Sequence, residues 1–198
     1  MPDKPDLISM LGSRICHDLI SPIGAISNGL ELLLMDGAQG GPEMVLMTES
    51  VANANARIRF FRIAYGIAQD DQRIGRAEVM SVLSDVTSGG RLKIDWQSEA
   101  DLSRPAVKVV FLLIQCLESA MAYGGLISVS LTHQKWQVSG RADKLRINTA
   151  HWDLLANPAA APDITPAIVQ FPLVAEEVLR RGYLLRATLA RTEILLEF

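Results

Sequence analysis

The 198-residue sequence predicts an α+β protein built from two parts. Residues 1–70 are expected to form an antiparallel helical hairpin that pairs with a second copy as a dimeric four-helix bundle, and residues 71–198 a two-layer α/β sandwich. Three observations support this prediction. Two long helical patterns flank a glycine-rich turn, strand-like and helix-like segments then alternate, and the composition, 49% hydrophobic and 21% charged, is that of a globular protein.

The hairpin prediction begins with the turn at residues 36–41, Asp-Gly-Ala-Gln-Gly-Gly, which separates two helical stretches. The first, residues 4–35, contains one helix-breaking residue, Pro22. The second, residues 42–69, opens on Pro42, which suits a first helical turn. A short loop between two long helices brings them together antiparallel. The apolar seam of the second helix repeats every three or four residues: Met44, Met47, Val51, Ala54, Ile58, Phe61, Tyr65 and Ala68.

The apolar face of the first helix is wider than one partner helix can cover. Its central line consists of Ile8, Leu11, Ile15, Pro22, Ile26 and Leu33, and Leu19, Ile23, Leu30 and Leu34 widen it. A two-helix hairpin cannot bury so broad a face, whereas a four-helix bundle built from two chains can. We therefore expect a homodimer.

The pattern changes after Asp71, where shorter segments predict the sandwich. Helices are expected over residues 76–87, 105–123 and 166–181, and strands over residues 91–97, 126–132, 135–140, 183–189 and 193–198. Residues 145–155 fit neither type clearly, and residues 157–166 are typical of a Pro/Ala-rich loop. Helices grouped against one mixed sheet make a two-layer sandwich.

Charge and composition argue against several classes of function. A net charge of −3 disfavours a nucleic-acid-binding surface, and the longest apolar runs, 30–35 and 109–114, are too short to cross a bilayer. Cys16 and Cys116 are far apart in the sequence and suit buried free thiols better than a disulfide or a metal site. We expect a cytoplasmic protein with no membrane or nucleic-acid partner.

His17 stands out from the other histidines because of its place on the first helix. On a helical wheel, the central apolar line lies opposite it. The residues on its own side are mostly small or polar: Met10, Ser13, Arg14, Ser21, Gly24 and Asn28. His17 is therefore expected to project into solvent. His133 and His151 have no cluster of potential ligands around them in the sequence, and structural or surface roles are expected for both.

The residues after His17 suit a nucleophile. An exposed imidazole is largely neutral at cytoplasmic pH, and neutral imidazole attacks electrophiles. A carboxylate such as Asp18 that accepts a hydrogen bond from one ring nitrogen fixes the tautomer and makes the other nitrogen more nucleophilic. Adjacent helical residues point about 100° apart, so Asp18 has to reach sideways. Pro22 bends the helix just past the histidine. His17 and Asp18 are the predicted catalytic pair.

Residues 17–26, His-Asp-Leu-Ile-Ser-Pro-Ile-Gly-Ala-Ile, resemble the phosphoacceptor box of sensor histidine kinases, which also lies on the first helix of a hairpin. In those kinases an ATP-binding sandwich follows. Residues 112–125 resemble its magnesium-holding helix, with Ser119 in place of the asparagine. The Asp-x-Gly-x-Gly box is missing from residues 138–143, and residues 169–173 replace a second glycine-rich turn. Such turns let backbone N–H groups approach phosphate closely. We expect no bound nucleotide, cofactor or metal.

The chain from about Asp6 to its end resembles the ChpT-type histidine phosphotransferases of alphaproteobacteria, which pair such a hairpin with a degenerate kinase-like sandwich. The resemblance implies that phosphate reaches His17 from the receiver domain of a hybrid histidine kinase. It then leaves to aspartates of response regulators, and the receiver domain supplies the magnesium. Two alternatives stay open: an ATP-dependent histidine kinase with a divergent nucleotide site, and a non-catalytic dimeric scaffold.

A basic surface of small residues beside His17 would help an acidic receiver domain to dock. Arg14 lies about 60° from His17 on the wheel and is the first candidate for such a contact. Ser21, Gly24 and Asn28 are the other expected partner-binding residues. On the second helix Arg57, Arg59 and Arg62 are weaker candidates, for which a solvated face is the favoured interpretation.

Overall fold

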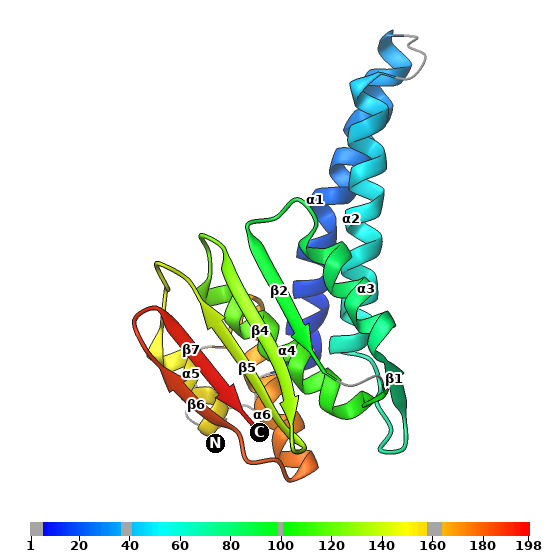
Figure 1. Cartoon of the computed structure of the whole chain (residues 1–198). Helices are drawn as coiled ribbons and strands as arrows, with labels where there is room; N and C mark the ends of the chain where they lie inside the picture. Colours follow the sequence, from blue (N-terminus) through cyan, green and yellow to red (C-terminus); the bar gives the residue numbers. More distant parts are fainter. Residues whose placement is uncertain (1–5, 37–40, 99–100, 158–163) are drawn as a thin grey trace.

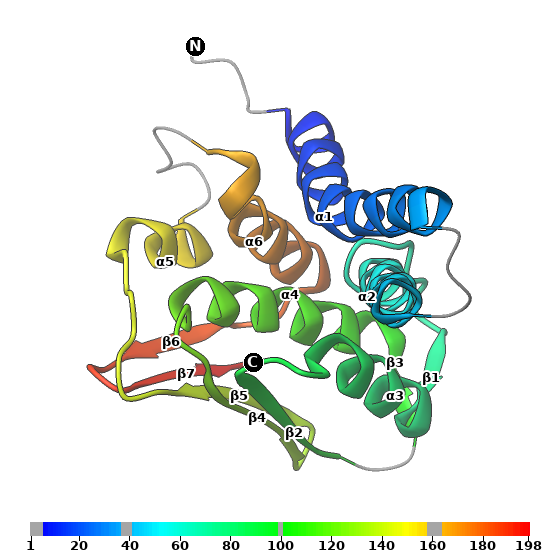
Figure 2. The same ribbon diagram turned by 90° about the horizontal axis from the view of Figure 1, so that it is seen from above.

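The computed structural model describes residues 6–36, 41–98, 101–157 and 164–198. It begins with the predicted hairpin, formed by α1 (Leu7–Asp36) and α2 (Pro42–Ala64). Figure 1 shows these helices side by side, with their connected ends extending away from the rest of the molecule. The first helix bends partway along its length, as the view from above shows (Figure 2), and Pro22 lies inside it. The start predicted at Lys4 and most of the predicted turn at 36–41 lie outside the described residues.

The second helix ends five residues before the predicted position. The Tyr65 N–H caps it by donating to the Phe61 carbonyl, and Gly66 follows at once. The first turn of α1 therefore has no facing turn of α2. Ile8, which was expected on the buried line of α1, is 84% exposed, so that expectation was wrong.

The second part contains a mixed five-stranded sheet and its helices. The strands are β2 (Leu92–Gln97), β4 (Gly125–Thr132), β5 (Lys135–Arg141), β6 (Arg186–Leu189) and β7 (Glu193–Glu197). Their order in the sheet is β2-β4-β5-β7-β6, with β2 and β4 parallel and the other pairs antiparallel. The remaining elements are β1 (Arg73–Gly75), α3 (Arg76–Thr87), β3 (Asp101–Ser103), α4 (Arg104–Ala120), α5 (Thr149–Ala156), the 3-10 turn η2 (Pro166–Ile168) and α6 (Gln170–Arg181).

The helices α4, α5 and α6 lie on one face of this sheet, which gives the predicted two-layer sandwich (Figure 2). Alternate residues of the strands point into the core, and Ile127, Val129 and Val138 are fully buried there. The central helix α4 is buried on nearly all sides, with Phe111 at 0% exposure. The short strands β1 and β3 pair with each other in a separate two-stranded ribbon that the sequence did not predict.

The C-terminal half of α2 joins the hairpin to the sandwich. Phe60 is 3% exposed, and its ring centroid lies 4.8 Å from that of Phe111. Arg104 at the start of α4 donates hydrogen bonds to the carbonyls of Arg62 and Ile63, at 2.8 and 3.0 Å. The lower part of the hairpin is thus packed against the second part, while its upper part extends beyond it (Figure 1).

The outer part of the hairpin leaves apolar side chains uncovered within a single chain. Three residues of the predicted α2 seam, Met44, Val51 and Ile58, are 44% to 51% exposed. On α1, Ile23 and Leu30 are also more than half exposed. Within the described residues, no helix is both long enough and apolar enough to span a membrane.

Candidate active site around His17

The His17 side chain projects from α1 and is 86% exposed, which confirms the exposure that the helical wheel predicts. Ser21, Gly24 and Asn28, the other small or polar residues expected on this face, are exposed as well. A Cβ atom added at Gly24 would meet no heavy atom within 4 Å. The surface next to the imidazole is therefore open to another molecule.

The Asp18 carboxylate makes the sideways contact that the sequence predicts. Its Oδ1 lies 3.2 Å from Nδ1 of His17, and its side chain is only 11% exposed. A proton on Nδ1, hydrogen-bonded to this carboxylate, leaves the lone pair on Nε2. The geometry therefore favours Nε2 as the nucleophilic atom.

The second oxygen of Asp18 is held by arginines. Arg14 donates from Nε to Oδ2 at 2.9 Å, and Nη1 of Arg57 lies 3.9 Å from the same oxygen. Arg14 also donates from Nη1 to the backbone carbonyl of Ala167, in η2, at 2.9 Å. Its side chain is 24% exposed. The guanidinium expected to face a docking partner thus makes two hydrogen bonds within the chain.

A polar cavity of about 250 Å³ lies behind Asp18, between the hairpin and the sandwich. Its lining includes Arg14, Asp18, Arg57, Gln115 and Glu118. Burial raises the pKa of Glu118 to about 7, while the positive charges of the two arginines oppose that rise. The sequence reasoning did not include Glu118 in the site, although a carboxylate near the end of an otherwise apolar helix was a usable signal.

Two comparisons with known proteins bear on the family to which this chain belongs. A family model described as the histidine phosphotransferase C-terminal domain matches residues 76–191. The protein phosphotransferase ChpT of Brucella abortus (strain 2308) is 35% identical over 165 residues, which cover 80% of this chain and 77% of that protein. This chain belongs to the histidine phosphotransferase family.

The fold of this histidine phosphotransferase is similar to that of a solved structure. A structure described as a bacterial phosphotransferase aligns with a TM-score of 0.82 at 28% identity, covering 100% of this chain and 97% of that one. A histidine kinase domain from Erythrobacter litoralis aligns with a TM-score of 0.46 at 15% identity, covering 97% of this chain and 90% of that one.

Two further arginines of α2 pair with α3 and do not approach Asp18. Arg59 donates to Asp85 and Ser81, and Arg62 forms an ion pair with Glu78 at 3.2 Å. They help to hold α3 against the hairpin, so these residues, 37% and 70% exposed, do not form the purely solvated face that the sequence favoured.

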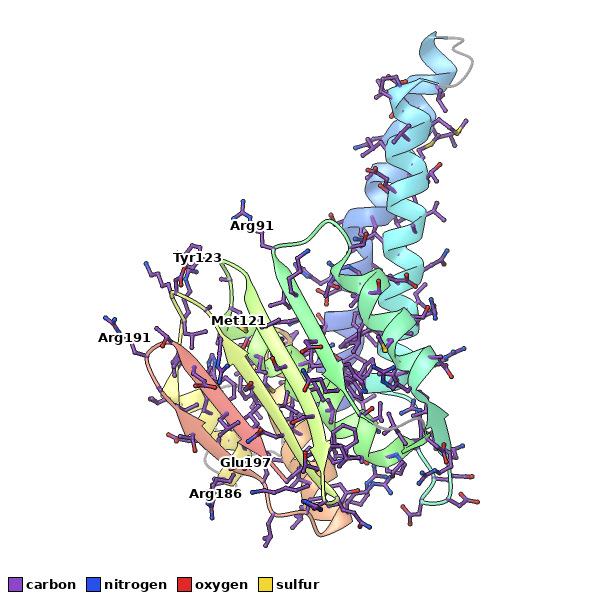
Figure 3. The ribbon with its side chains drawn as sticks, in the orientation of Figure 1. Arg91, Met121, Tyr123, Arg186, Arg191 and Glu197 are labelled. Atoms are coloured by element: carbon purple, nitrogen blue, oxygen red, sulfur yellow. The ribbon has the colours of Figure 1, made fainter. Side chains whose placement is uncertain are left out.

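The end of the sheet near Ser119 is where the kinase resemblance would place a nucleotide. The Ser119 hydroxyl donates to the Cys116 carbonyl of its own helix at 2.6 Å. Arg91 and Tyr123 lie at this end of the sheet, with Met121 just inside it (Figure 3). Among the described residues, no group of three or more His, Cys, Asp or Glu side chains is arranged to hold a metal ion.

Proposed function

We propose that His17 accepts a phosphoryl group from a receiver-domain aspartate of a hybrid histidine kinase and passes it to the aspartate of a response regulator. The observation that carries this proposal is the pairing of an 86% exposed imidazole with a nearly buried carboxylate at 3.2 Å on Nδ1. That arrangement leaves Nε2 free to react with a phosphoryl group on another protein.

His17 and Asp18 have separate roles in the proposed phosphoryl transfer. The Nε2 lone pair of His17 attacks the phosphorus of an aspartyl phosphate, and the bond between phosphorus and the aspartate oxygen breaks in line with it. The electron pair leaves with the aspartate carboxylate. Positive charge that develops on the ring is offset by Asp18 through Nδ1–H. The receiver domain supplies the magnesium that neutralises the phosphoryl oxygens.

The docking surface that we propose consists of Ser21, Gly24 and Asn28, while Arg14, which the sequence also placed there, is bonded within the chain to Asp18 and Ala167. Small side chains let another protein approach the imidazole closely, and all three are exposed.

We also propose that the molecule is a homodimer built on the hairpin. Apolar side chains of both helices are exposed in the single chain, among them Ile23, Leu30, Val45, Val51 and Ile58, at 44% to 58%. Large apolar side chains exposed on both helices of one hairpin are typical of a protein interface. A second copy would complete a four-helix bundle, with residues 1–70 as the dimerisation and phosphotransfer domain and residues 71–198 as a kinase-like sandwich without nucleotide chemistry. We place this dimer in the cytoplasm.

The test follows label from a phosphorylated receiver domain to the protein. We expect wild type to take up the label in an acid-labile form, His17→Gln to take up none, and Asp18→Asn to take it up much more slowly. His133→Gln is the matched control, because it replaces another exposed histidine, at the β4–β5 turn. Label on His17→Gln would overturn the proposal.

The same protein, incubated with labelled ATP and magnesium without any kinase, tests the first alternative. Autophosphorylation of His17 would establish an ATP-dependent histidine kinase with a divergent nucleotide site. Unchanged phosphate flow to response regulators in His17→Ala would instead favour a non-catalytic scaffold.

A further inference from the structure

We propose that Arg14 is a positioning residue that ties the orientation of Asp18, and through it of His17, to the seating of the sandwich against the hairpin. The inference rests on the proposed function, since it concerns the same histidine. The structure forms a continuous chain of contacts from the carbonyl of Ala167 through Arg14 and Asp18 to the ring of His17.

Two hydrogen bonds hold the rigid guanidinium group of Arg14. Its Nε donates to Asp18 Oδ2 and its Nη1 donates to the Ala167 carbonyl, both at 2.9 Å. The guanidinium is planar and its donors stand at fixed angles, so two such bonds fix where it lies. Lysine has a single ammonium group on a flexible stem and cannot reproduce both bonds with the same geometry.

The carboxylate of Asp18 needs this partner. At 11% side-chain exposure it has lost most of its water, and a buried carboxylate is costly unless it is paired and hydrogen-bonded. Arg57 is farther away, at 3.9 Å, and donates from its Nε to Asn53. Arg14 is thus the main neutralising group. Without it, the carboxylate gains by turning towards water, and Oδ1 leaves Nδ1 of His17.

The Ala167 carbonyl connects this chain of contacts to the second part of the molecule. It belongs to η2, a 3-10 turn in which Pro166 fixes its own backbone angle and the Ile168 N–H donates to Thr165. The carbonyl accepts from Arg14 across 153 positions of the sequence. A backbone acceptor fixed in this way holds the guanidinium only while the sandwich is seated against α1. The sandwich would then contribute to phosphotransfer without any nucleotide.

The alternative role for Arg14 is contact with the receiver domain. The two roles make different predictions about kinetics. Loss of a docking cation weakens the encounter, so KM rises and the rate at saturating receiver domain is kept. Loss of a positioning residue lowers the rate at saturation and changes the histidine even when no partner is present.

The experiment compares Arg14→Gln and Arg14→Lys with wild type and with Arg62→Gln, a control arginine of the hairpin that is paired with Glu78 on α3. The first readout is the nitrogen-15 spectrum of the His17 ring in the protein alone, which reports which nitrogen carries the proton. The second is the rate of transfer from a phosphorylated receiver domain as the receiver concentration is varied. Circular dichroism and urea unfolding establish that each variant is folded.

We expect both Arg14 variants to lose the preference for a proton on Nδ1 and to lower the saturating rate by at least about tenfold, with less than about a threefold change in KM. In the Asp18→Asn background the Arg14 substitutions should lower the saturating rate little further, because both residues act on the hydrogen bond between Asp18 and Nδ1 of His17. A wild-type nitrogen spectrum, a loss confined to KM, or fully additive losses would each overturn the proposal.

A second variant, Pro166→Gly, loosens η2 without touching the hairpin. We expect it to shift the His17 nitrogen spectrum in the same direction as Arg14→Gln and to lower the saturating rate by about two- to fivefold. An unchanged spectrum would refute the link to the sandwich. The nitrogen spectrum needs no phosphotransfer, so it separates failure of this inference from failure of the proposed function, which label on His17→Gln would reveal.

Discussion

Glu118 lies on α4 beside the polar cavity, and replacing it with glutamine removes its charge while keeping its shape. Burial raises the pKa of this carboxyl to about 7 in the folded chain, against an ordinary value of 4.5. Between those values the folded chain holds a proton that the unfolded chain has lost. Stability contributed by the neutral form is therefore present at low pH and falls as pH rises through this window.

The size of this pH-dependent change in the free energy of unfolding follows from the difference between the two pKa values. Without any screening by solvent, that difference corresponds to about 3 kcal/mol. Because the Glu118 side chain is half-buried, screening by solvent reduces this to on the order of 2 kcal/mol. Glutamine cannot ionise and escapes the penalty. Relative to wild type, the free energy of unfolding of Glu118→Gln should thus rise by on the order of 2 kcal/mol between about pH 5 and about pH 8.

The measurement is urea unfolding followed by the fluorescence of the buried tryptophans Trp96, Trp136 and Trp152, at one protomer concentration and several pH values. Any constant effect of the substitution cancels when the difference between variant and wild type is compared across pH. Glu49→Gln, at an exposed position of α2, is the matched control and should give a flat difference. A flat difference for Glu118→Gln, or one that falls with pH, would refute the reasoning.

Three further outcomes are expected. Glu177→Ala should cost about 3–5 kcal/mol in urea unfolding, because it leaves Lys108, 3.3 Å away, and a neighbouring arginine without their buried counter-charge. Burial alone would raise the pKa of Glu177, but hydrogen bonds from arginines lower it, so its contribution should fade as the solution is acidified. Phe111→Ala should cost about 3–5 kcal/mol in the same assay, since the ring is fully buried. Cys116 is buried as expected, but Cys16 is exposed, so its expected burial was wrong. A thiol reagent should modify Cys16 quickly in the native protein and Cys116 only on denaturation, because burial raises the pKa of the Cys116 thiol and blocks access to it. Equal labelling rates, measured by mass spectrometry of the peptides, would contradict this.

The elements that the sequence predicted well are those with local signals at both ends. The predicted limits of α3 coincide with Arg76–Thr87, because Gly75 precedes the helix and Ser88-Gly89 ends it. The ambiguous stretch over residues 145–155 contains α5, whose local signal was present: the Asn148 side chain caps the helix by accepting from the Ala150 N–H at 3.2 Å.

The elements that were missed or misplaced depend on contacts far along the chain. The three-residue strands β1 and β3 are too short for any period, and only their pairing with each other defines them. The end of α2 was placed too late because Tyr65 and Ala68 still fit the helical period, while the Tyr65 hydroxyl donates to Gln115 of α4. The helical period therefore does not mark that boundary, where the Tyr65 N–H caps the helix and Gly66 follows.

The same distinction between local and distant signals applies to the residues of the site. Helical periodicity alone predicted the exposure of His17, and sequence adjacency alone suggested its contact with Asp18. The acceptor of Arg14 is a backbone carbonyl, which carries no side-chain signature, so no pattern of residue types could predict the contact with Ala167.

The contacts between the hairpin and the sandwich are consistent with an external source of phosphate. They come from several separate elements: Phe60 packs on Phe111, Arg104 bonds carbonyls of α2, and Arg14 bonds the carbonyl of Ala167. A chain that receives phosphate from another protein gains from keeping them, because they hold the acid beside His17 in place while the partner changes.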